Sequence, residues 1–532
     1  MIKRALPMLA LAASLASINM SAHAQSQGDQ ALLDALVRKG VLTDKEAQQI
    51  SAETAKEAVT TSASKIQIGD WVQELKIGGD FRNRFQADQR TPLILSNPLL
   101  GPQDRHINRD RWRFRLRLNA DFKLAGNFFG GFQLSTSDNR SASTKNATYT
   151  GGYDNYGIYI TRAFMGWAPT PGLTFIAGKQ ANPFYTTDLI YDPEVDPQGL
   201  VERVDFSKFF NMTFGEPVAA EGKAPPPAPP PPGNSLELSV IAGQFVFNNN
   251  NANSGNTQLK WDAYAFQEQL LAKLKIGDKL SITEAPGFLA YSNASSGGTP
   301  GPHGTIVPPV STQGQTFDGP PANNNFGNTL GNSGPFPVTQ RDLNIILAPG
   351  DITYKICGKP LSLYWDFAYN FTGDQRFTRD YGPLFTHYFY VGKSSTPSFQ
   401  HPAFPSFSDN SSWLIGLKFG ENKKACDFSV SVDYRQVGIS SIDPNINSDN
   451  FALSNLNAQG WQFNLAYNFT DFLTAVVTVF YSYALHPNLY GGYATGNVIN
   501  PATGQQFPSS QQYPIARDRQ DLVLQANLLM KF

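Results

Sequence analysis

Fourteen consecutive residues, from Arg111 to Leu124, alternate between polar and apolar side chains without a fault. Successive side chains of a β-strand point to opposite faces, so this segment predicts a strand with one charged and one apolar face. The charged face carries Arg111, Arg113, Arg115 and Arg117. Strands of soluble proteins are usually about 5–6 residues long, whereas a membrane strand needs about 9–11 residues. The segment is therefore typical of a transmembrane barrel.

The same alternation recurs from Trp71 to the end of the chain. Short turns and long polar loops connect the alternating segments. We predict an all-β transmembrane antiparallel barrel of 16 strands, with 14 or 18 as alternatives. A secreted β-sandwich is the competing fold, but its outer faces do not need rows of arginine. The predicted strands are 72–88, 110–125, 128–137, 156–168, 173–180, 202–213, 235–247, 260–275, 279–291, 340–356, 361–373, 411–421, 425–437, 459–469, 472–484 and 518–532.

The arginines of the charged face decide which side of the strand faces the lumen. An arginine at mid-membrane on the lipid side costs about 2–4 kcal/mol, so four would cost about 8–16 kcal/mol. That is comparable to the whole stability of a domain, about 5–15 kcal/mol. We therefore expect Arg111 to Arg117 to line a water-filled pore, beside Arg82 and Arg84 of the preceding strand. Neutralisation by Asp80 and Asp121 would remove the anion preference that these arginines suggest.

An acidic stretch follows the strand predicted at 173–180 and carries Asp188, Asp192, Glu194 and Asp196. Folded inward, this loop would narrow the pore and set acids against the arginines. Such a constriction would impose a transverse field favouring polar or zwitterionic solutes. The alternative is a solvent-facing loop or a surface Ca²⁺ site.

The amino terminus has the layout of a signal peptide. Two cations, Lys3 and Arg4, precede a short apolar run, and Ala22-His23-Ala24 supplies small residues for cleavage after residue 24. Residues 25–65 are predicted to form a periplasmic helical hairpin and linker, and residues 66–532 the barrel. The formal net charge is only −1, so no global field attracts nucleic acid.

Cys357 and Cys426 are the two cysteines of the chain, and both fall at predicted periplasmic turns. Strands 361–373 and 411–421 place these turns side by side, and the periplasm is oxidising. We therefore predict a disulfide between them, with two free thiols as the alternative. We expect no cofactor and no metal site, because the histidines lack metal-ligand spacing. No nucleophile elbow, zincin motif or phosphate loop points to an enzyme.

Four pieces of sequence resemble the putative porin family of Gram-negative outer membranes. They are the segment from Leu32 to Thr43, the segment from Lys76 to Arg82, the segment from Gly178 to Phe184, and the terminal Phe532. The resemblance implies a passive diffusion channel in the outer membrane, which can be a trimer. The chain departs from the family in the Pro-rich segment 224–233. With the strand count above this segment is periplasmic, and without strand 202–213 it is extracellular.

From these observations we expect an outer-membrane porin, surrounded by lipid, that passes small hydrophilic solutes or ions. The arginines suggest a preference for anions, and neutralisation by neighbouring acids is the alternative. An apolar last strand ending in Phe532 is typical of barrels delivered to the barrel-assembly machinery. Two alternatives stay open: a tether in which residues 29–58 bind the cell wall and the barrel is only an anchor, and a channel for one specific solute.

Overall fold

The structure, a computed structural model, describes residues 71–91, 107–137, 144–210, 233–248, 263–292, 342–380, 407–444, 446–452, 456–486, 493–494, 513–514 and 520–532. Contacts divide the chain into two units, residues 1–72 and 73–532. The signal peptide predicted for residues 1–24 and the helical hairpin and linker predicted for residues 25–65 lie outside the described residues. Within the described part of the chain, no helix is long and apolar enough to cross a membrane.

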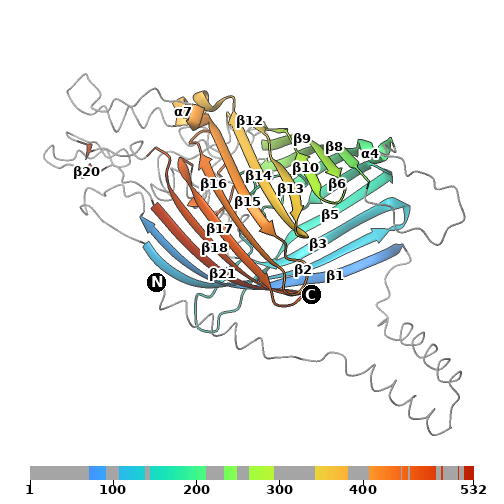
Figure 1. Ribbon diagram of the computed structural model, residues 1–532, viewed down its shortest axis with the longest axis horizontal. Helices are drawn as coiled ribbons and strands as arrows, with labels where there is room; N and C mark the ends of the chain where they lie inside the picture. Colours follow the sequence, from blue (N-terminus) through green and yellow to red (C-terminus); the bar gives the residue numbers. More distant parts are fainter. Residues whose placement is uncertain are drawn as a thin grey trace, which may run out of the picture. The chain divides into compact units, whose positions relative to one another are not determined.

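The second unit is built from one antiparallel sheet (Figure 1). Its first half contains β1 (Val72–Thr91), β2 (Ile107–Leu124), β3 (Phe128–Thr136), β4 (Ala147–Thr148), β5 (Ile158–Thr170), β6 (Leu173–Lys179), β7 (Gln198–Asp205), β8 (Ser235–Asn248) and β9 (Ala263–Ile276). The second half contains β10 (Leu280–Glu284), β11 (Gly287–Ser292), β12 (Asn344–Leu347), β13 (Gly350–Ile356), β14 (Lys359–Asn370), β15 (Ser411–Gly420), β16 (Phe428–Val437), β17 (Ala458–Asn468), β18 (Leu473–Ala484) and β21 (Gln520–Lys531).

A few short elements lie between or beside these strands. The helices are η1 (Ala125–Asn127), α4 (Phe206–Phe209), α7 (Gly373–Asp380) and α9 (Phe407–Asn410). The small strands β19 (Tyr493–Ala494) and β20 (Tyr513–Pro514) pair with each other and not with the large sheet.

The sheet closes on itself because the first strand pairs with the last. β1 runs beside β21 from Asp80 opposite Lys531 to Thr91 opposite Gln520. β10 and β11 both pair with β9, and β12 and β13 both pair with β14, so each of these two couples is one interrupted strand. The result is a closed antiparallel barrel of 16 strands, which confirms the predicted fold and strand count.

One predicted strand is displaced. The sequence predicted strand 202–213, whereas β7 spans Gln198–Asp205. Asp205 ends the strand because its side chain accepts a hydrogen bond from the backbone N–H of Lys208 at 3.2 Å and so caps helix α4. Since β7 is present, the connection that contains the Pro-rich segment begins and ends at the same end of the barrel as the short turns. The segment itself lies outside the described residues, apart from Gly233.

The two ends of the barrel differ in their connections. At the short-turn end β2 joins β3 through η1, and β5 joins β6 through two residues. In the second of these turns Gly172 has φ +85, and a Cβ there would lie 2.5 Å from the Asp205 carbonyl oxygen. Only glycine fits both conditions. The connections at the opposite ends of the strands form the long-loop end of the barrel.

The alternation along β2 sorts side chains between the inside and the outside of the barrel. Arg113 and Arg115 are each 5% exposed, whereas Trp112 and Leu118 on the opposite face are 43% and 37% exposed. Large apolar side chains cover the outer wall on other strands too, such as Met165 on β5 and Phe463 on β17. The outer wall is therefore apolar, as a bilayer requires.

Aromatic rings gather on the outer wall at both ends. At the short-turn end Trp167 stacks between Phe128 and Phe175, with ring centroids 5.9 and 6.2 Å apart. Toward the long-loop end Tyr434 lies 4.8 Å from Trp461. Amphipathic rings favour the boundary between lipid and water, so these two belts mark the height of the membrane.

The predicted disulfide is not formed. The turns after β13 and β15 do lie side by side, since Lys359 Nζ is 2.6 Å from Asp427 Oδ1. However, Cys357 and Cys426 are both free and exposed. The two turns are joined instead by this ion pair, and the Cys426 thiol is in hydrogen-bond contact with Tyr467 of β17. The sequence predicted the proximity of the turns correctly and the covalent bond wrongly.

The inside–outside assignment predicts opposite results for neighbouring substitutions on β17. Phe463 lies on the outer wall between Val432 and Val479, and Asn464 faces inward. We expect Phe463→Arg to reduce the free energy of unfolding by about 2–4 kcal/mol, because a guanidinium then faces lipid. Denaturant unfolding in lipid vesicles measures this change. Asn464→Arg is the control, and a larger loss for this variant would mean that the faces are reversed.

Candidate functional site

The connection between β6 and β7, residues 180–197, crosses the interior of the barrel, and we call it the inward loop. The backbone N–H of Tyr185 donates to Gln269 Oε1 on β9 at 2.8 Å, and the Gln269 amide donates back to the Tyr185 carbonyl at 2.7 Å. Farther along, Thr187 Oγ1 donates to Asp366 Oδ2 on β14 at 2.8 Å. Neither β9 nor β14 pairs with β6 or β7. These bonds therefore tie the loop to distant parts of the inner wall.

A second loop, from the opposite side of the barrel, packs on the inward loop. It joins β16 to β17, residues 438–457, and is described except at 445 and 453–455. The Asp192 N–H donates to the Ile446 carbonyl at 2.7 Å, and the Ser448 N–H donates to the Asp188 carbonyl at 3.0 Å. Apolar side chains of both loops belong to one buried cluster: Leu189, Ile190, Tyr191, Val195, Ile439, Ile442, Ile446 and Phe451. The lumen thus holds an apolar core of its own.

Three of the six predicted pore-lining arginines share two carboxylates. Arg82 Nη2 lies 2.9 Å from Glu194 Oε1, and Arg115 binds the same oxygen. Arg115 also binds Asp80 at 2.7 Å, and Arg117 Nε binds the other oxygen of Asp80 at 2.6 Å. Glu194 and Asp80 therefore connect three arginines of two strands to the inward loop.

The other three predicted arginines have different partners. Arg111 Nη2 lies 2.8 Å from Asp88, Arg113 donates to Thr144 Oγ1 at 3.3 Å, and Arg84 donates to Asn527 Oδ1 at 2.6 Å. All six side chains lie on the inner wall. The structure brings Arg82, Arg115 and Arg117 into one network.

The four predicted acids do not face the arginines across a gap. Glu194 contacts them directly, and Asp188 binds Arg435 of β16 at 2.9 Å. Asp196 binds Arg162 Nε at 2.7 Å and also pairs with Lys145. Asp192 accepts the Glu194 and Asp449 N–H groups at 2.8 and 3.3 Å. The expected transverse field between separated walls is thus replaced by contacts that hold the loop in place.

The network that joins Asp80, Glu194 and Asp196 contains more cations than acids. The cations are Arg82, Arg115, Arg117, Lys145 and Arg162, so the formal charge is 5 − 3 = +2. Burial alone would raise the pKa of Glu194, but the charges of Arg82 and Arg115 hold that pKa well below its usual range. The carboxylate is therefore ionised at neutral pH, and the excess of positive charge persists.

Two other acids of the loops, Asp192 and Asp449, have raised pKa values instead. Burial, followed by the charge of Asp449, raises the pKa of Asp192 well above its ordinary value. Burial also raises the pKa of Asp449 to about 6, although the charge of Arg113 acts against it. The contact between the two loops therefore contains a pair of carboxyl groups that bind protons more readily than ordinary aspartates do.

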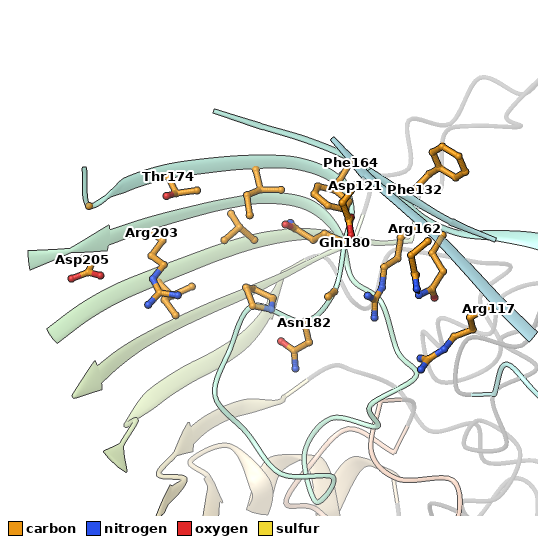
Figure 2. Close-up of a pocket in the computed structure, with 18 of the residues that line it drawn as sticks. Arg117, Asp121, Phe132, Arg162, Phe164, Thr174, Gln180, Asn182, Arg203 and Asp205 are labelled. Carbon is orange, nitrogen blue, oxygen red and sulfur yellow. The ribbon is translucent and has the colours of Figure 1, made fainter. Parts of the chain in front are cut away.

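A cavity of about 700 Å³ lies below the inward loop, on the side of the short-turn end. Figure 2 shows Arg117 and Arg162 at one side of this cavity, Arg203 and Asp205 at the other side, and Asn182 of the inward loop between the two sides. Its wall comes from β2, β3 and β5 to β8, with Lys208 of α4 at the short-turn end. This size is ordinary for a site that binds a small molecule.

Sequence reasoning missed several members of the network. Arg162 lies on a predicted strand, but a bulge at Thr161 reverses the alternation there, so counting from the outward Ile158 and Ile160 would have placed Arg162 outside. Lys145 lies in a long polar loop that shows no period, so no pattern indicated its role. Arg435 was recognised as part of an alternating strand, but its ion pair with Asp188 depends on contacts between distant strands.

Residues 94–331, a little under half of the chain, match the family described as putative porin. The match confirms, over these residues, the resemblance that the sequence motifs indicated. No curated protein matches the chain.

Solved structures with some likeness include two engineered variants of the porin from Rhodopseudomonas blastica. A triple mutant has 10% identity and a TM-score of 0.34, and covers 86% of this chain and 100% of its own. A double mutant has 11% identity and a TM-score of 0.34, with the same coverage. At this level of similarity neither structure bears on activity.

The raised pKa values predict that acid tightens the contact between the two loops. The pKa of Asp449 in the folded protein, about 6, lies above its ordinary value of 3.8, so the folded state gains protons and stability as pH falls through 6. We expect amide hydrogen exchange in residues 180–197 to slow between pH 7 and pH 5, after correction for intrinsic rates. Mass spectrometry of the folded protein measures this change.

Asp449→Asn is the matched control for this measurement. It removes one of the two acids that take up protons, so the pH dependence of exchange should shrink. Glu194 stays ionised over this pH range because its pKa is depressed. Faster exchange at pH 5 than at pH 7 would contradict the prediction and would mean that the ion pairs of Glu194 fail first.

Proposed function

We propose that this chain is an outer-membrane porin that forms a water-filled channel for passive diffusion of small hydrophilic solutes. The observation that carries the proposal is the closed 16-strand barrel with an apolar outer wall and a charged inner wall. The match of residues 94–331 to the putative porin family supports it. A barrel of this size usually leaves space for an aqueous channel. The porin fold and family favour a channel over an enzyme.

The charges of the lumen support a preference for anions. The network around Glu194 and Asp196 has an excess of positive charge, and rings or rows of arginine attract anions in pores. Because acids of the inward loop already neutralise part of this charge, we propose a mild preference. In this proposal the inward loop is the constriction, and Asp188, Asp192, Glu194 and Asp196 fix its position.

The parts of the chain outside the described residues complete the proposal. Residues 1–24 act as a cleaved signal peptide, residues 25–65 form a periplasmic helical segment and linker, and residues 66–532 form the barrel. The short-turn end is then periplasmic, and so is the Pro-rich segment. Phe532 supports recognition by the barrel-assembly machinery, and the resemblance to porins supports a homotrimer.

Conductance in a planar bilayer tests the function. We expect refolded full-length protein to give large, steady current steps, and a salt gradient to give a reversal potential of anion-selective sign. Glu194→Gln should increase the anion selectivity, because it removes one negative charge from a network that already has an excess of cations. Absence of current from verified folded barrels would overturn the porin assignment.

A matched variant tests whether a change of charge must lie inside the pore to alter selectivity. Glu421 lies in the turn after β15, where it pairs with Lys423. Glu421→Gln makes the same change of charge at a partly exposed turn outside the barrel interior, where water and salt screen it. We expect its reversal potential to equal that of the unmodified protein. A reversal potential of cation-selective sign in all three proteins would assign selectivity to the acids of the inward loop.

A further inference from the structure

Gln180, at the start of the inward loop, has a buried amide without a hydrogen-bond partner among the described residues. Its side chain is 3% exposed, and it lines the cavity below the loop. The backbone holds the residue in position, since its N–H donates to the Pro197 carbonyl at 2.9 Å. Nevertheless, Nε2 makes no hydrogen bond to any residue that the structure describes. A buried donor that is left unpaired is costly, so this group is suited to donate to a ligand.

The guanidinium groups of Arg117 and Arg162 line the same cavity, and each uses only its Nε atom in a hydrogen bond within the described residues. Arg162 bonds Asp196 through Nε at 2.7 Å, and Arg117 bonds Asp80 through Nε at 2.6 Å. Within the described part of the chain neither group makes another hydrogen bond, so the terminal nitrogens of both are available. Figure 2 shows both side chains on the same side of the cavity. A guanidinium group binds most strongly to an acceptor with negative charge, such as a carboxylate.

The protein itself shows which acceptor fits this row of cations. The Asp196 carboxylate binds Arg162, which lines the cavity, and in the same network the Glu194 carboxylate sits between Arg82 and Arg115. A carboxylate of a solute that enters the cavity would continue this arrangement. Of the four cations that line the cavity, Lys208 pairs with Asp205 and Arg203 pairs with Glu237. The partners of Arg117 and Arg162, which are Asp80 and Asp196, are each shared with a second cation, so the excess of positive charge lies on this side.

The rest of the lining includes apolar side chains. Ile176, Val201 and Ile241 line the cavity, and the last two are otherwise almost fully buried in the wall. A cavity of about 700 Å³ with one cationic side and an apolar side suits a ligand that has both characters. A free inorganic anion would use only the cationic side.

We infer that this cavity is a binding site for small monocarboxylates with an apolar body, such as aromatic or branched-chain acids. The carboxylate accepts hydrogen bonds from Arg162, Arg117 and the Gln180 amide, and the apolar body packs on Ile176 and Val201. The inference rests on the proposed function, because it names the class of solute that the porin would favour. It places the site on the short-turn side of the inward loop.

Calorimetric titration of the folded full-length protein in detergent, with benzoate and benzamide as probes, tests the site. The two molecules have nearly the same shape and differ in charge. We expect benzoate to bind at least about tenfold more tightly than benzamide, because a hydrogen bond to a charged group is stronger than one between neutral groups. Equal affinity for the two probes, or no binding of benzoate, would overturn the inference.

Variants then assign the site to its residues. Gln180→Leu and Arg162→Gln should each weaken benzoate binding by about tenfold. Gln180→Glu keeps the shape of the side chain and should weaken benzoate binding further, because it sets two carboxylates against each other. The matched control is Lys423→Gln, which removes one cation from an exposed turn outside the cavity. Unchanged benzoate affinity in the folded cavity variants would contradict the assignment.

The same titration separates this inference from the proposed function. Binding in detergent does not require current across a bilayer. Protein that conducts but does not bind benzoate would keep the porin and lose the carboxylate site. Protein that binds benzoate but does not conduct would keep the site and lose the channel.

Discussion

Backbone polar groups in hydrocarbon have no water to bond, and this constraint governs the barrel. It explains why the sheet closes, with β1 paired to β21 along twelve residues. It also explains the strict alternation along β2, because a closed sheet has only an outside that meets lipid and an inside that meets water. Once Trp112 and Leu118 face outward, Arg113 and Arg115 must face inward. The buried cations in turn need carboxylates, and the inward loop supplies three of them, Asp188, Glu194 and Asp196.

The interior combines two kinds of stabilisation that usually occur in separate proteins. Ion pairs attach the inward loop to β1 and β2 on one side and to β16 on the other, through Glu194 and Asp188. Between these attachments the two loops bury an apolar cluster, as a small soluble domain would. The ion pairs fix where the loop lies, and the apolar cluster fixes its conformation. In the proposed channel, solutes would pass beside this structured insert.

The sequence predicted the barrel well because alternation is a local signal that repeats in every strand. Its main error was at Asp205, where a helix cap ends β7 early, and such a cap competes with strand pairing over only a few residues. The candidate site was predicted only in part. Parity placed the arginines inside, but the partners of Asp188 and Asp196 come from distant strands and loops. The disulfide failed for a related reason: proximity of two turns does not set the direction of two thiols.

The seam between β1 and β21 has a consequence for the order of assembly. Phe532, directly after β21, exchanges two backbone hydrogen bonds with Gly79 of β1, at 2.8 and 3.1 Å. The barrel therefore cannot close until β21 is present to pair with β1. Until then both β1 and the growing end of the sheet expose unpaired edges, which readily join other strands. A chain of this design depends on being kept from aggregation through its entire passage, and a truncated copy would never lose its open edge.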